Sequence, residues 1–81
     1  MMMTKQEFGR RLDAMIRDRD LDLASFARLA NLPRNNVSSY VNGRSYPSEA
    51  SLRKLADALG MGPEALLPGA ADFHRAVRFL R

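Results

Sequence analysis

Residues that favour β-strands are scarce in this chain, and this scarcity constrains the fold more than any other feature of the sequence. Only five residues are β-branched (Thr4, Ile16, Val37, Val41 and Val77), against eleven leucines and eleven alanines. Leucine and alanine are strong helix formers, whereas β-branched side chains lose rotamer freedom in a helix. The balance therefore predicts an all-α fold.

Capping and helix-breaking residues divide the chain into short helices. Thr4 and Glu7 have the spacing of a capping box, which predicts a first helix over residues 5–17. Asp22 is a good N-cap for a second helix over residues 23–30. Residues of the same kinds mark the ends of three further helices. One runs from Pro33 to Gly43, one from Ser48 to Gly60, and a short one begins at Gly62-Pro63 and ends at Pro68-Gly69.

The length of 81 residues allows one small domain with a single modest core. We expect a five-helix domain over residues 1–69 and an extra helical tail over residues 70–81. The chain has no cysteine and one histidine, His74, so disulfide scaffolds, thiolate metal sites and histidine-cluster metal sites are excluded. No metal or other cofactor is expected, and His74 is expected to be an exposed residue of the tail.

Thirteen basic residues against nine acidic ones give a net charge of +4, which favours an anionic partner. No apolar run approaches the roughly 18 residues that a membrane span needs. The first residues also contain no apolar stretch long enough for a signal peptide. We therefore expect a cytoplasmic protein without a membrane partner.

The segment from Leu21 to Gly43 has the pattern of a helix-turn-helix. Two short helices meet at Asn31, a residue that readily takes the left-handed conformation in which helices end. Ala27 is small where the two helices approach closely, and Leu32, Val37 and Tyr40 supply the apolar wedge between them. Such an arrangement lets the second helix stand out from the domain and enter a major groove.

Over residues 7–68 the chain resembles the phage repressor and Cro class of helix-turn-helix proteins, the XRE-type domain. Ala27 matches the family's small residue on helix 2, Asn31 stands for its turn glycine, and Val37 and Tyr40 match its two buried recognition-helix positions. The next stretch, NGRSYPSEASLRKLADALGMGPEALLPG, is similar to the family's Asn-Gly-basic corner, Pro-Ser helix start and Leu-x-x-Leu-Ala-x-Ala-Leu-Gly helix. The resemblance implies a repressor-like fold that binds DNA.

The chain departs from the family pattern in two places. A glutamine that binds phosphate often opens helix 2 in the family, and this chain has Leu23 there. The family also often pairs an arginine on helix 1 with a glutamate on helix 3, where this chain has Ile16 and Val41. Since both charged partners are replaced together, packed hydrocarbon can substitute for the ion pair without loss of stability.

No acidic residue lies between Asp22 and Glu49, and this window contains the expected recognition helix together with Arg28, Arg34 and Arg44. A surface that approaches phosphates should have this distribution of charge. The alternative is a chance gap in a chain with only nine acidic residues.

The outward side of the third helix carries the side chains expected to bind DNA. Arg34 can donate two hydrogen bonds to guanine and Asn35 can form two with adenine, and Ser39 is also expected at a base; the resemblance implies the same roles. Phosphate contacts are expected from Asn36, Ser38, Asn42, Arg44, Ser45 and Tyr46, and from backbone N–H groups at the start of the second helix. The alternatives are that Arg34, Asn35 and Asn36 are solvated surface residues and that Tyr46 is a local lid on Pro47.

One such domain makes few contacts, so we expect a homodimer on a palindromic operator with half-sites about 34 Å apart. The candidate dimer surface contains Leu66, Phe73, Val77 and Leu80. Alternatively, the tail stripe of Phe73, Ala76, Val77 and Leu80 folds back onto the protein's own core.

The leading hypothesis is a phage-type transcriptional repressor that binds double-stranded DNA, with no enzymatic activity and no small-molecule ligand. The second is an antitoxin-like module that binds another protein and regulates its own gene.

Overall fold

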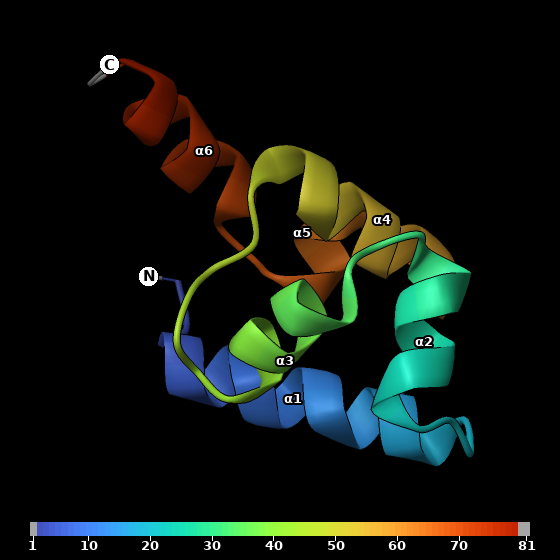
Figure 1. Ribbon diagram of the computed structural model, residues 1–81. Helices are drawn as coiled ribbons and strands as arrows, with labels where there is room; N and C mark the ends of the chain where they lie inside the picture. The colour runs from blue at the N-terminus through green and yellow to red at the C-terminus, as the bar shows by residue number, and fades with distance from the viewer. Residues whose placement is uncertain (1, 80–81) are drawn as a thin grey trace.

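The computed structural model describes residues 2–79, except for the side chain of Phe79, and over this range the chain forms helices and no strand. The elements are α1 (Lys5–Asp18), α2 (Leu23–Ala30), α3 (Arg34–Val41), α4 (Glu49–Leu59), α5 (Pro63–Leu66) and α6 (Ala70–Phe79). Helices α1–α5 gather around one core, and α6 extends away from them (Figure 1), which lengthens the molecule to 37 × 22 × 21 Å. The predictions of an all-α fold and of an additional C-terminal helix are confirmed.

Within residues 2–79, no helix has both the length and the apolar character that crossing a bilayer requires.

Polar side chains fix where three of the helices begin. The Thr4 hydroxyl accepts a hydrogen bond from the Glu7 amide at 3.1 Å, and the Glu7 carboxylate accepts one from the Thr4 amide at 2.8 Å, which completes the predicted capping box. Asp22 accepts from the Ser25 amide at 2.7 Å, and Ser48 accepts from the Ser51 amide at 3.2 Å. These caps satisfy amides that have no partner inside their own helix.

Helices α1 to α4 end in the same motif, in which one residue adopts a left-handed conformation and the next donates its amide back to a carbonyl five positions earlier. The left-handed residues are Asp20, Asn31, Gly43 and Gly60, and the residues that follow them are Leu21, Leu32, Arg44 and Met61. Leu21, Leu32 and Met61 pack against the core. Among these four following residues, only Arg44 is charged, and it is exposed.

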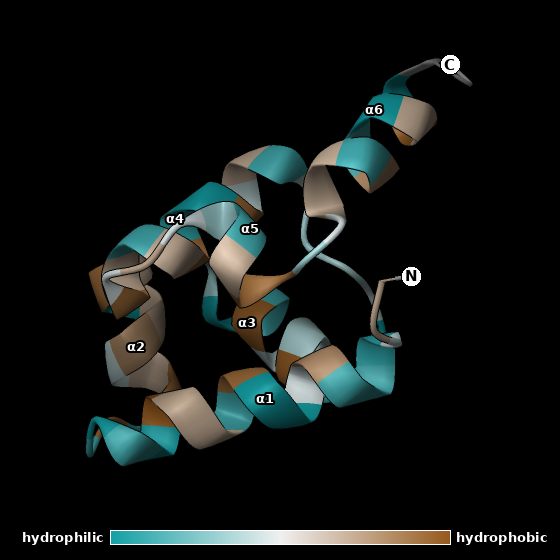
Figure 2. Ribbon diagram, turned by 180° about the vertical axis from the view of Figure 1, so that it is seen from behind, coloured by the Kyte–Doolittle hydropathy of each residue, from teal (hydrophilic) through white to brown (hydrophobic). Residues whose placement is uncertain are grey.

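The core collects one apolar face from each of α1 to α5 (Figure 2). Its largest fully buried side chains are Phe8, Phe26, Leu12, Leu52, Leu55, Leu66, Leu67, Val37 and Pro47. Ile16 is buried and Val41 is half-buried against the same core. The two residues that stand in place of the family's ion pair therefore both contribute to apolar packing.

Two expectations for the C-terminal part of the chain need correction. Leu66 is fully buried beneath the chain's own helices, so it has no surface to offer a partner. His74 is only 8% exposed and is therefore not an exposed tail residue. Ala70 and His74 of α6 are both buried, which shows that α6 turns a different face inward from the predicted stripe.

Helices α1 and α3 approach each other so closely that α1 needs a glycine at the crossing. A Cβ atom added to the buried Gly9 would lie 2.5 Å from the carbonyl oxygen of Val41 and 2.6 Å from that of Tyr40. Both carbonyls belong to the last turn of α3. The backbone of α3 therefore rests directly on the backbone of α1.

We predict that Gly9→Ala destabilises the protein. In an unhindered helix this change would stabilise by about 0.5–1 kcal/mol, but the overlap with backbone atoms outweighs that gain. We expect a net loss of about 1–3 kcal/mol in the free energy of unfolding, measured by urea denaturation with circular dichroism.

Gly62→Ala is the matched control, because a Cβ added there has no neighbour within 4 Å. Because Gly62 is the N-cap of α5, where alanine is less favourable, the unfolding midpoint of Gly62→Ala should fall slightly, and by less than that of Gly9→Ala. Equal midpoints for Gly9→Ala and the wild type would contradict the close contact of α1 and α3.

Candidate nucleic-acid interface

The α2–turn–α3 segment places α3 on the surface of the domain. Asn31 ends α2 with φ 57° and ψ 47°, and the Leu32 amide donates to the Ala27 carbonyl at 2.9 Å. Pro33 then occupies the N-cap of α3. The chain thus turns from α2 into α3 within three residues, and the predicted left-handed conformation of Asn31 is confirmed. Ala27 is buried beside this turn.

The inner side of α3 packs on α1 and α2 through Val37 and Tyr40, which are 0% and 6% exposed. This burial confirms the expectation that Tyr40 is a core residue. The outer side, in contrast, carries only polar side chains. Arg34, Asn35 and Asn36 are all exposed in the first turn.

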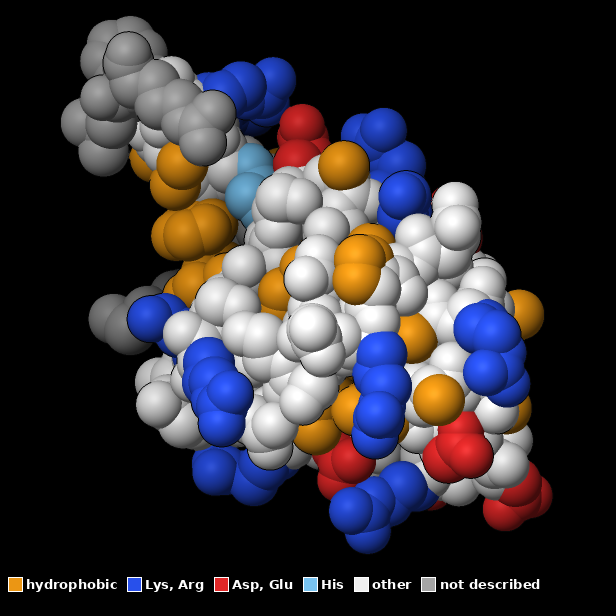
Figure 3. Space-filling view, in the orientation of Figure 1, with side chains coloured by type: hydrophobic (Ala, Val, Ile, Leu, Met, Phe, Trp, Pro, Cys, Tyr) orange, Lys and Arg blue, Asp and Glu red, His pale blue; other side chains and the backbone are white. Residues whose placement is uncertain are grey.

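The face that carries α3 is shown in Figure 3. Uncharged polar side chains and backbone dominate its centre, and Lys and Arg side chains surround them. Most of the acidic side chains visible in this view lie towards the lower edge, near the start of α2 in Figure 1. The charge distribution expected from the acid-free window is therefore present on the folded surface.

Hydrogen bonds hold the serines on the later turns of α3. The hydroxyl oxygens of Ser39 and Ser45 are 2.8 Å apart, and the Asn42 amide donates to the Ser38 hydroxyl at 3.1 Å. Ser38 and Ser39 are half-buried. In the Ser39–Ser45 pair one hydroxyl donates to the other, so one hydroxyl proton remains for a further acceptor.

The end of α3 fixes the position of Arg44. Gly43 is buried with φ 71°, and a Cβ atom there would lie 3.1 Å from the Cα of Gln6 on α1. The Arg44 amide donates to the Ser39 carbonyl at 3.0 Å. Because its backbone is held in this way, the exposed guanidinium extends from a rigid base beside α3.

Tyr46 has a structural role in place of the expected phosphate contact. Its hydroxyl donates to the Met3 carbonyl at 2.6 Å, and its ring centroid lies 5.2 Å from that of Phe73. The side chain is half-buried. The structure therefore favours the local-lid alternative, with Phe73 as the packing partner, and Tyr46 is left out of the phosphate contacts considered below.

The start of α2 already holds a negative charge. The Asp22 carboxylate accepts a hydrogen bond from the Ser25 amide, which lowers the pKa of Asp22, and the positive charges of Arg28 and Arg34 lower this pKa further. A phosphate would have to compete with this carboxylate for the same amide. The expectation of a backbone phosphate site at the start of α2 is therefore not retained.

Sequence reasoning missed His74, whose Nε2 atom lies 3.0 Å from the Pro47 carbonyl oxygen inside the molecule. A pattern that could have revealed it is the spacing of Ala70 and His74, which puts both on one face of α6. A lone histidine among arginines conceals that pattern, because histidine is intermediate in how often it is buried and its neighbours are mostly exposed. Within residues 2–79, no three metal-ligating side chains cluster.

Comparison with known proteins agrees with this geometry. The model of the Cro/C1-type HTH DNA-binding domain matches residues 11–68, and the chain belongs to this family. It is therefore a helix-turn-helix DNA-binding transcription regulator. No match is found among curated protein sequences.

Several solved structures resemble the chain. The restriction-modification controller protein C.AhdI from Aeromonas hydrophila is 31% identical over 76% of this chain and 94% of its own, with a TM-score of 0.71. ComR from Streptococcus suis is 25% identical over 84% of this chain and 22% of its own, with a TM-score of 0.76. The clp gene regulator ClgR from Corynebacterium glutamicum shares the fold, at 20% identity over 96% of this chain and 83% of its own and a TM-score of 0.70.

The lowered pKa of Asp22 predicts how the α2 cap responds to acid. A carboxylate whose pKa is lower in the folded state contributes stability above its unfolded pKa and loses it as the pH falls through the folded pKa. Asparagine caps helices about as well but does not titrate. As the pH falls from about 5 to about 2, the wild type should therefore lose free energy of unfolding that Asp22→Asn keeps. Urea denaturation at a series of pH values measures this difference.

Asp57→Asn is the control, since Asp57 is exposed near the end of α4 and caps no helix. The relative stability of this control should change less with acidification. If the curves for Asp22→Asn and the wild type remained parallel, the cap would not be the source of the pKa shift.

Proposed function

We propose that this protein is a sequence-specific transcriptional repressor that binds a palindromic DNA operator as a homodimer, with α3 in the major groove. The observation that carries the proposal is the exposed, uniformly polar first turn of α3, with Arg34, Asn35 and Asn36 projecting from a buried scaffold. The first turn of a recognition helix is the part that reaches base edges in this class of motif.

Base recognition is assigned to Arg34, Asn35 and Ser39. Arg34 can donate two hydrogen bonds to guanine O6 and N7, and Asn35 can form two hydrogen bonds with adenine N6 and N7. Ser39 would use the hydroxyl proton or lone pairs that its pairing with Ser45 leaves available. Asn36, Ser38, Asn42, Arg44 and Ser45 are assigned to phosphates, where contacts set the register of the protein on DNA.

The dimer contact is assigned to the exposed side of α6. Val77 is 42% exposed, and among the large hydrophobic side chains of the described residues Leu29 on α2, at 59%, is exposed as well. Ala76, beside Val77, is also exposed. Phe73 lies on the same helix but packs partly against Tyr46. Within the tail stripe, Phe73 therefore contacts the chain itself, whereas Ala76 and Val77 are assigned to the partner copy. Leu80, the fourth residue of the stripe, lies outside the described residues.

Selection of bound sites from a pool of random duplexes tests the proposal. We expect a palindromic consensus whose half-sites lie about one helical turn apart. On the selected duplex, Arg34→Ala or Asn35→Ala should each cost about 1–3 kcal/mol of binding free energy and relax the preference for one base pair. Fluorescence anisotropy titrations on selected and random duplexes provide both quantities.

Arg44→Ala should act differently, because a phosphate contact carries no sequence information. We expect equal losses on both duplexes and a salt slope flatter by about one unit. Arg53→Ala, on α4, removes the same charge away from α3 and should have little effect. Equal losses on both duplexes for Arg34→Ala would reassign Arg34 to the backbone contacts, and the absence of any consensus would end the proposal.

Val77→Asp tests the dimer without removing α6, whose Ala70 and His74 are part of the buried structure. A charge on the exposed face should dissociate the dimer, because an unpaired carboxylate would become buried in the contact. Sedimentation velocity should then report the monomer mass, while Ala14→Asp, at an exposed position on α1, should leave the mass unchanged. An unchanged mass for Val77→Asp would remove α6 from the dimer contact.

A further inference from the structure

We propose that α6 positions the DNA-binding loop, and that Phe73 and His74 are positioning residues for the phosphate-contacting side chains of Arg44 and Ser45. Below, the loop means residues 44–47, which connect α3 to α4. The inference rests on the proposed function, because it concerns the same DNA-binding side chains. It adds a role for α6 that is separate from dimerisation.

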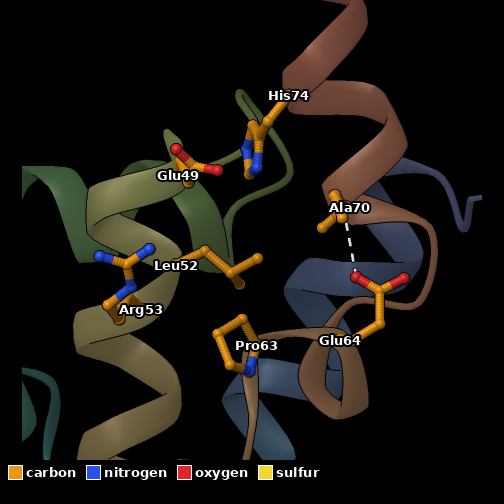
Figure 4. A pocket seen from close by; sticks show the side chains of 8 residues that line it. Glu49, Leu52, Arg53, Pro63, Glu64, Ala70 and His74 are labelled. Atoms are coloured by element: carbon orange, nitrogen blue, oxygen red, sulfur yellow. Dashed lines mark hydrogen bonds between the residues drawn. The ribbon is translucent and has the colours of Figure 1, made fainter.

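The start of α6 is held in place by the short helix before it. The Glu64 carboxylate accepts hydrogen bonds from the Gly69 amide at 2.7 Å and from the Ala71 amide at 3.2 Å. Figure 4 shows one hydrogen bond from Glu64 to the start of α6 as a dashed line. Further along, the Arg78 guanidinium lies 3.4 Å from the Glu49 carboxylate on α4. A pocket lies between α6 and helices α4 and α5, so α6 depends on a small number of specific contacts.

His74 makes the contact that reaches the loop. Its side chain projects from α6 towards the start of α4 (Figure 4), and Nε2 lies 3.0 Å from the Pro47 carbonyl oxygen. A carbonyl oxygen can only accept, so Nε2 carries the proton and donates. Because Pro47 is fully buried, its carbonyl has no water to replace this donor. The end of the loop is therefore tied to α6.

Phe73 contacts the preceding loop residue. Its ring centroid lies 5.2 Å from that of Tyr46, with the ring planes inclined by 55°, and 5.6 Å from the ring of His74. On its other side, Tyr46 donates its hydroxyl to Met3. Tyr46 is thus held between α6 and the N-terminal segment.

The two fixed residues lead directly to the DNA-binding side chains. Ser45 directly precedes Tyr46, and its hydroxyl is hydrogen-bonded to the hydroxyl of Ser39 on α3. Arg44 directly precedes Ser45. The loop is thus fixed at its start by the end of α3 and at its finish by α6. Only four residues, 44–47, separate Gly43 from the cap residue Ser48. A shift of Tyr46 and Pro47 therefore displaces Ser45 and strains the hydrogen bond from the Arg44 amide to the Ser39 carbonyl.

The test compares His74→Leu with His74→Gln, on the selected duplex and on a random duplex. Leucine fills the space without a donor, whereas the glutamine amide can donate in place of Nε2–H. For His74→Leu we expect binding about three- to tenfold weaker on both duplexes and a salt slope flatter by about one unit, since the Arg44 phosphate contact is lost. His74→Gln should restore both. Phe73→Leu, at a half-buried position, is a second variant and should repeat the pattern of His74→Leu.

Leu59→Ala is the control that separates general destabilisation from a specific displacement of the loop. It removes buried apolar volume at the end of α4 away from the loop. This control should lower the free energy of unfolding and leave the salt slope of the folded fraction unchanged. Hydrogen exchange without DNA adds a readout that does not depend on the proposed function. The Arg44 amide should exchange faster in His74→Leu and Phe73→Leu, and at the wild-type rate in His74→Gln.

Faster exchange of the Arg44 amide would support the coupling even if no duplex bound, and that result would count against the proposed function alone. Wild-type salt slopes and wild-type Arg44 exchange in both His74→Leu and Phe73→Leu would overturn the inference.

Discussion

The contact of α3 with α1 at Gly9 is the constraint on which the interface depends. The carbonyls of Tyr40 and Val41 lie against the α1 backbone, closer than any side chain at position 9 would allow. This contact fixes the depth of α3 in the domain, and the burial of Val37 and Tyr40 fixes its rotation. With depth and rotation set, Arg34 and Asn35 must face outward. The polar surface of α3 is thus a consequence of what lies behind it.

The four similar helix ends show how a helix-terminating motif that stabilises the fold can also form part of a binding surface. At α1, α2 and α4, the residue after the left-handed position is apolar and packs on the core. At α3 the same backbone motif presents Arg44. The motif keeps the backbone rigid, so arginine in place of an apolar residue directs charge to the surface from a fixed backbone position. The loop after it then connects this rigid end to α6 through Tyr46 and Pro47.

Most of the helical framework could be predicted because it depends on local chemistry. Thr4, Asp22 and Ser48 cap the helices they were expected to cap, and Asn31, Gly43 and Gly60 take the left-handed conformation expected of them. Each depends on bonds between residues a few positions apart. The prediction failed at α6, where the side that faces the domain is chosen by distant partners. His74 bonds to a carbonyl 27 residues away, and Tyr46 meets Phe73 across the same separation.

The sequence by itself determined the number and bounds of the helices, the buried side of α3 and the lack of acidic charge around it. Caps and turn conformations depend on residues within one or two helical turns, so the sequence specifies them without reference to distant contacts. Only the tertiary structure decided that His74 is buried, that Leu66 lies inside the core and that Tyr46 packs on Phe73. Those outcomes depend on where α6 lies relative to the loop and the N-terminal segment. Their contacts join residues far apart in the chain, and no local pattern specifies such pairs.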